Sequence, residues 1–156
     1  MKTMKSIFIT LFISLISSGI HAQSFSQQEI TDSIFVRIEG KSFKKNCTTP
    51  REDLRYLKVL HYNKKGEELE GELICHKDIA DDLLAIFREL HRAKYPIERM
   101  VLIDEYDADD EASMRANNTS AFNFHPASGM RRLSKHSTGM AIDINPLYNP
   151  LVKHRE

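Results

Sequence analysis

The stretch DLRYLKVLHYNKKGEELEGELIC, residues 53–75, decides the fold class of this chain. Residues 53–62 are rich in β-branched and aromatic side chains, which favours a strand. Residues 63–66, Asn-Lys-Lys-Gly, are typical of a hairpin turn. Residues 69–75 then return as a second strand, with Gly71 at a candidate bulge position. The stretch therefore predicts an antiparallel hairpin.

Helical periodicity follows the hairpin. The apolar residues from Ile79 to Leu90 recur at the spacing of one helix face, Asp78 is a candidate N-cap, and Tyr95-Pro96 ends the pattern. Further strands are expected at residues 34–38 and 100–103. We predict one α+β domain, a mostly antiparallel sheet with flanking helices.

Composition excludes several classes of protein. The 156 residues carry 22 Lys+Arg and 22 Asp+Glu. This balance argues against a nucleic-acid partner, since binding phosphates needs an excess of cations. No apolar run reaches the roughly 18 residues of a membrane-spanning helix. Six acids crowd residues 104–111, where we expect a solvated loop, with a calcium loop as the alternative.

The first 22 residues have the order of a secretory signal: Lys2 and Lys5, an apolar core, then small residues before Gln23. We expect a signal peptide at 1–22, a mature domain at 23–156 and a periplasmic or secreted location, with an uncleaved anchor as the alternative. In an exported protein Cys47 and Cys75 are expected to form a disulfide. Two inert thiols are the other reading.

The chemistry is concentrated in residues 134–144, SKHSTGMAIDI. Alternation from Met140 to Ile144 predicts a short strand with one apolar face and Asp143 on the other. Gly139 permits a tight turn that could fold His136 back over Asp143. An imidazole and a carboxylate make up two of the three protein ligands of a catalytic zinc. A structural Asp and a surface His are the simpler alternative.

The pattern Ser-x-His-x-x-Gly-x-Ala-x-Asp-Ile resembles the zinc signature of the D-alanyl-D-alanine carboxypeptidase and L-alanyl-D-glutamate endopeptidase family. Further stretches between about residues 35 and 152 are similar to one secreted branch of that family, among them 53–57, 109–114, 117–123 and 145–150. The resemblance implies cleavage of peptidoglycan stem peptides and the fold shared with lysostaphin-type peptidases and the hedgehog signalling domain.

Carried over residue by residue, the resemblance implies that His136 and Asp143 are zinc ligands. Ser134 occupies a signature position and is expected to support the site near the substrate. His125 stands where the related branch usually carries an Arg suited to gripping substrate oxygens, a bidentate contact that a neutral His cannot make.

The family pattern also includes a third ligand, preceded by a catalytic acid in an acid-x-x-His arrangement. Only His154 follows Asp143, and Leu151 stands where the acid is expected. We therefore expect a peptidase-like domain that lacks its C-terminal segment and is inactive as these 156 residues. The alternatives are a non-catalytic exported protein that binds wall peptides and a small exported structural protein.

Overall fold

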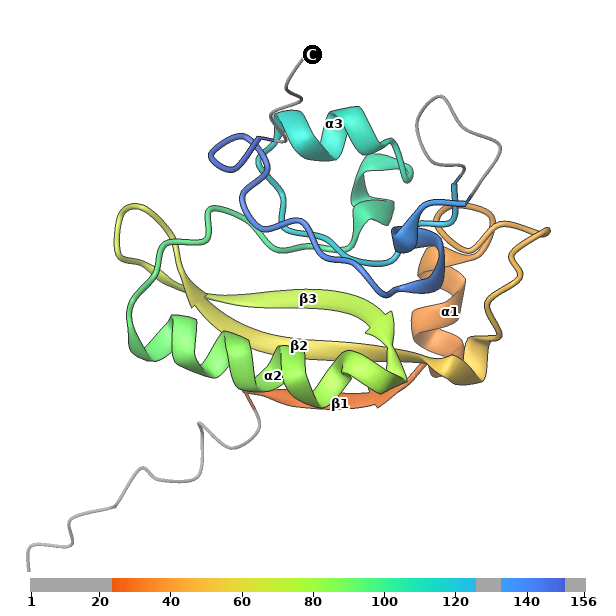
Figure 1. Cartoon of the computed structure of the whole chain (residues 1–156), viewed down its shortest axis with the longest axis horizontal. Coiled ribbons are helices and arrows are strands. Elements are labelled where there is room, and N and C mark those ends of the chain that lie inside the picture. The colour runs from red at the N-terminus through yellow and green to blue at the C-terminus, as the bar shows by residue number, and fades with distance from the viewer. Residues whose placement is uncertain (1–23, 126–132, 151–156) are drawn as a thin grey trace, which may run out of the picture.

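The computed structural model describes residues 24–125 and 133–150 (Figure 1). Its sheet has the order β1-β2-β3, with β1 at Ser26–Glu29, β2 at Leu54–Tyr62 and β3 at Glu68–His76. Both pairings are antiparallel, which confirms the α+β class and the hairpin. The expected signal peptide, residues 1–22, lies outside the described residues.

The helices are α1 at Asp32–Ile38, α2 at Lys77–Arg92 and α3 at Asp110–Arg115. Three short 3-10 turns complete the described elements: η1 at Arg51–Asp53, η2 at Ile103–Tyr106 and η3 at Lys135–Thr138. Within the described ranges, no helix is long and apolar enough to cross a membrane.

Alternation along the hairpin divides the core into two clusters. Leu57, Val59, Leu73 and Cys75 face α2, where Leu83 and Phe87 are buried. Intervening residues such as Leu54, Tyr56 and Ile74 form a second cluster with Ile34 and Ile38 of α1. The sheet therefore separates two apolar layers, as the period of two along a strand requires.

Irregular segments continue the sheet past β3. Glu72 N donates to Met100 O at 2.9 Å, and Phe122 N donates to Ile74 O at 2.9 Å. The strand predicted at 100–103 is thus wrong as an element, although Met100 and Leu102 are buried. The missing side chain of Gly71 lets Met100 approach, since a Cβ there would lie 2.7 Å from Met100 Sδ. Pairing runs through Gly71 without a bulge.

Residues 34–38 belong to a helix, so the strand prediction there is wrong. Ile34 and Ile38 share a buried helix face, whereas Val36 is 75% exposed. In a strand all three would have pointed to one side. The N-cap of α2 is also corrected: Asp78 N donates to His76 Nδ1 at 3.2 Å, so His76 caps the helix.

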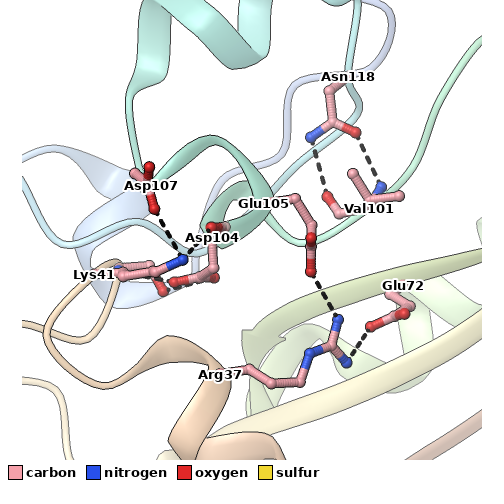
Figure 2. Close-up of polar contacts among 9 residues, drawn as sticks. Arg37, Lys41, Glu72, Val101, Asp104, Glu105, Asp107 and Asn118 are labelled. Carbon is pink, nitrogen blue, oxygen red and sulfur yellow. Dashed lines mark hydrogen bonds and ion pairs between the residues drawn. The ribbon is translucent and has the colours of Figure 1, made fainter.

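The acidic segment is solvated except at Asp104, which is only 4% exposed. Ser42 donates to its carboxylate from the backbone N at 2.9 Å and from Oγ at 3.0 Å. Lys41 Nζ donates to Asp104 O and pairs with Asp107, both at 2.9 Å (Figure 2). Asp104 therefore ties η2 to the loop after α1, although burial raises its pKa.

Candidate metal centre

The signature residues around His136 form a capped single turn. Ser134 Oγ accepts a hydrogen bond from His136 N at 3.2 Å, as an N-cap does. Gly139 ends η3 in the left-handed region with φ 68°, and its N–H donates to His136 O at 3.0 Å. The spacing Ser-x-His-x-x-Gly is thus the spacing of a cap, a turn and a C-cap.

Gly139 also docks this turn onto the sheet. Its carbonyl accepts from His76 N at 3.0 Å, where β3 runs into α2. A Cβ at Gly139 would lie 2.6 Å from His76 N and 3.0 Å from the Cys75 carbonyl carbon. Backbone atoms cannot rotate away from such a contact, so only glycine fits here.

The imidazole of His136 is held from one side by a backbone carbonyl. Its Nδ1 lies 2.6 Å from Ala121 O, and its side chain is 19% exposed. A carbonyl only accepts hydrogen bonds, so Nδ1 carries the proton. Metal-binding histidines are commonly oriented in this way, which frees Nε2 as a ligand. Sequence reasoning missed Ala121, because a backbone acceptor has no signature.

Asp143 is placed by a backbone pairing with Ser120. Asp143 N donates to Ser120 O at 2.9 Å, and Ser120 N donates to Asp143 O at 3.1 Å. This is an isolated bridge and not the predicted strand. Ile142 and Ile144 pack against the α2 cluster, but Met140 is 41% exposed, which corrects the expectation that all three face the core.

The two predicted ligands meet. His136 Nε2 lies 3.3 Å from Asp143 Oδ2, and the Asp143 side chain is 46% exposed. A charge-assisted hydrogen bond is typically shorter, about 2.7–2.9 Å. Two ligand atoms about 2.1 Å from a tetrahedral zinc stand about 3.4 Å apart. The spacing is therefore longer than a charge-assisted hydrogen bond and is compatible with two ligands of one zinc ion.

These two residues have no third partner of the same kind among the residues that the structure describes. There, no three His, Cys, Asp or Glu side chains gather closely enough to hold a metal. His154, the other histidine considered from the sequence, lies outside the described ranges.

His125 lies beside the pair. Its ring is roughly parallel to that of His136, with 6.4 Å between centroids. Its backbone is fixed by Ser137, which accepts from His125 N at 3.0 Å and donates to His125 O at 2.6 Å. Ser137 O in turn accepts from Thr49 Oγ1 at 2.9 Å. The structure brings His125 and Ser134 to the site, and shows that Ser137, which the sequence did not single out, helps to build it.

The predicted disulfide is wrong for this structure, in which Cys47 and Cys75 are both free. Cys75 is fully buried on the α2 face of the sheet, whereas Cys47 packs against the cluster on the opposite face. Burial raises the pKa of Cys75 to about 12. Each thiol is thus separated from the other by the sheet.

Comparison with known proteins bears on the same segment. Residues 128–156 match the family model described as D-alanyl-D-alanine carboxypeptidase. The matched range contains His136 and Asp143 and covers 29 of the 156 residues. Neither the curated proteins nor the solved structures gave a match. The hedgehog-like fold and the similarity of residues 35–127 to the secreted branch stay predictions.

Proposed function

We propose that this chain is a zinc-dependent peptidase acting on the stem peptides of peptidoglycan, as a D,D-carboxypeptidase or an L,D-endopeptidase. The observation that carries the proposal is the 3.3 Å spacing of His136 Nε2 and Asp143 Oδ2, with Nδ1 of the same imidazole held by Ala121 O. The family match over residues 128–156 supports it independently.

His136 and Asp143 are the residues that would hold zinc. When bound, zinc polarises a scissile carbonyl and activates a water molecule. His136 keeps its Nε2 lone pair directed toward Asp143, because Nδ1 carries the proton and donates it in a hydrogen bond to Ala121 O. The cap from Ser134 keeps the His136 backbone in place. Among the described residues no third His, Cys, Asp or Glu gathers with this pair, so the proposal assigns these two ligands alone.

His125 is proposed as a substrate contact beside this pair. Its ring is inclined by 23° to that of His136, and Ser137 holds its backbone. A histidine offers a ring N–H to a peptide oxygen but not the bidentate grip of arginine. We further propose that residues 1–22 direct export, so that the protein meets its substrate in the periplasm or outside the cell.

Zinc binding by the purified protein tests the site. We expect His136→Ala and Asp143→Ala each to abolish the zinc uptake measured by competition with a chromogenic chelator. His91→Ala and Asp110→Ala are the controls, since His91 lies on α2 and Asp110 on α3. Unchanged zinc affinity in both site variants would contradict the assignment.

The type of peptidase is tested with defined substrates. A pentapeptide stem ending in D-Ala-D-Ala reports carboxypeptidase activity, and a stem with an intact L-Ala–D-Glu bond reports endopeptidase activity. Release that a chelator abolishes and zinc restores supports the proposal. Zinc binding without cleavage of either bond would favour a protein that binds wall peptides without cutting them.

A further inference from the structure

A polar cavity lies on the side of β3 that faces η2. Its volume is about 310 Å³, and its lining combines two guanidinium groups, two carboxylates, a phenol and one valine: Arg37, Arg99, Glu72, Glu105, Tyr106 and Val101. We call it the Arg99–Glu105 cavity. Figure 2 shows Arg37 reaching between Glu72 and Glu105.

One ion pair in this cavity is tight. Arg37 Nη1 lies 2.7 Å from Glu72 Oε2, and both side chains are about one-third exposed. The hydrogen bond to Glu72 raises the pKa of Arg37. This pair links α1 to β3 and forms a fixed wall.

Two other charged groups, Glu105 and Arg99, make only long polar contacts. Arg37 Nη2 is 3.4 Å from Glu105 Oε1, beyond the usual range of a charge-assisted hydrogen bond, and the Glu105 side chain is 57% exposed. Among the described residues, the Arg99 guanidinium hydrogen-bonds only to Tyr106 Oη, at 3.3 Å. The Glu105 carboxylate therefore has acceptor sites left for a ligand, and the Arg99 guanidinium has N–H donors left for one.

The cavity lies near the segment that positions the proposed zinc ligands. Glu72 also lines a smaller space shared with Ser120 and Ala121. Ser120 pairs with Asp143, and Ala121 O holds His136. Because Thr119 N donates to Arg99 O at 2.8 Å, Arg99 is about one inter-strand spacing from the segment that precedes Ser120.

The distance between the Arg99–Glu105 cavity and the proposed zinc ligands is within the length of one short peptide. Arg99 pairs with Asn118, and Ser120 pairs with Asp143. Two inter-strand spacings and the step between Asn118 and Ser120 together span at most about 17 Å, roughly five residues of extended peptide. The backbone positions of Asp143 and Arg99 are therefore no farther apart than a short extended peptide is long.

We propose that the Arg99–Glu105 cavity binds a zwitterionic amino-acid group of the substrate, with its carboxylate on Arg99 and its ammonium on Glu105. Two cations and two anions leave the lining neutral, which suits a ligand carrying both charges over a simple anion or cation. The volume is at the small end for ligand pockets, which suits one amino-acid group. The identity of the ligand as part of a peptide substrate rests on the proposed function.

Three small probes test the pairing of charges in the unaltered protein. We expect 2,6-diaminoheptanedioate, with an ammonium and a carboxylate at each end, to bind in a calorimetric or NMR titration. Heptanedioate, which lacks the ammonium groups, and 1,5-diaminopentane, which lacks the carboxylates, should bind at least tenfold more weakly. Equal binding of the three probes, or no binding of the first, would overturn the proposal.

Variants assign the binding to this cavity. Arg99→Gln and Glu105→Gln should each weaken binding of 2,6-diaminoheptanedioate at least tenfold. Arg115→Gln, at an exposed arginine paired with Glu111 on α3, should not. Retained affinity in Arg99→Gln would refute the assignment. His136→Ala should leave this affinity unchanged, so failure of the zinc site and failure of the cavity give different results.

Discussion

Replacing Gly139 with alanine should damage the fold and the metal centre together. The residue has φ 68°, where an alanine costs about 1–2 kcal/mol. Its new Cβ would lie 2.6 Å from His76 N, against backbone that cannot turn aside. Relieving that contact requires η3 to move away from β3, which also weakens the hydrogen bond from His76 N to Gly139 O.

Gly66 provides a matched control. It has φ 76° in the hairpin turn, but an added Cβ there would meet nothing within 4 Å. Gly66→Ala therefore carries only the conformational cost. Gly139→Ala adds overpacking, about 1–3 kcal/mol, and a weakened hydrogen bond of about 1 kcal/mol. We expect Gly139→Ala to lower the free energy of unfolding by about 2–4 kcal/mol more than Gly66→Ala.

Urea unfolding followed by far-UV circular dichroism measures this difference. Zinc titration gives the second readout, since displacement of η3 moves His136 away from Asp143. We expect zinc affinity to fall in Gly139→Ala and to stay unchanged in Gly66→Ala. Equal unfolding free energies for the two variants would refute the docking of η3 on β3, and a Gly139→Ala protein that keeps full zinc affinity would separate that docking from the metal centre.

Three further predictions concern other groups. Under native conditions a maleimide should label Cys47, which is partly exposed, but not the buried Cys75. In denaturant without reductant it should label both thiols, and a failure to label either one would support the predicted disulfide instead. Because burial raises the pKa of Asp104 above 3.8, the stability that it contributes is complete below that pH and is lost as pH rises through the raised value. Asp104→Asn should remove this loss, so that its unfolding free energy relative to wild type increases between pH 4 and 7; a pH-independent difference would contradict the prediction. Ser134→Ala removes the cap of η3 and should lower stability by about 1 kcal/mol and zinc affinity about tenfold, as measured by urea unfolding and chelator competition; unchanged zinc affinity would show that the cap does not position His136.

The parts of the fold predicted correctly depend on contacts close in sequence. The β2–β3 hairpin and α2 follow from alternation, turn residues and helical spacing within residues 53–92. Residues 34–38 were misassigned because Ile34 and Ile38 are four apart, a spacing that fits one face of a helix and one face of a strand. Only the tertiary structure, which leaves Val36 exposed, distinguishes the two.

Long-range partners explain the remaining errors. The burial of Asp104 requires Ser42, which is 62 positions away in the sequence. The disulfide was predicted from the number of cysteines in an exported chain. That number does not reveal that alternation along β3 places Cys75 on the face of the sheet away from Cys47. The proximity of His136 and Asp143 could be predicted because Gly139 supplies a turn between them. The hydrogen bond between His136 Nδ1 and the Ala121 carbonyl could not, because a backbone acceptor has no sequence signature.

The signature contains positions that build the local fold and a position that is proposed to bind metal. A match to the fold-building positions alone does not establish zinc binding. Ser134 and Gly139 are accounted for without any metal, since one caps η3 and the other docks it onto the sheet. Asp143 is different: its backbone alone completes the bridge to Ser120, and in the described residues its carboxylate contacts only His136. A structural role would tolerate Asp143→Asn with little change in either fold or His136 geometry, whereas a zinc ligand would not retain its affinity without the negative charge. Zinc titration of Asp143→Asn, a substitution nearly equal in size, therefore separates the chemical role of the signature from its structural one.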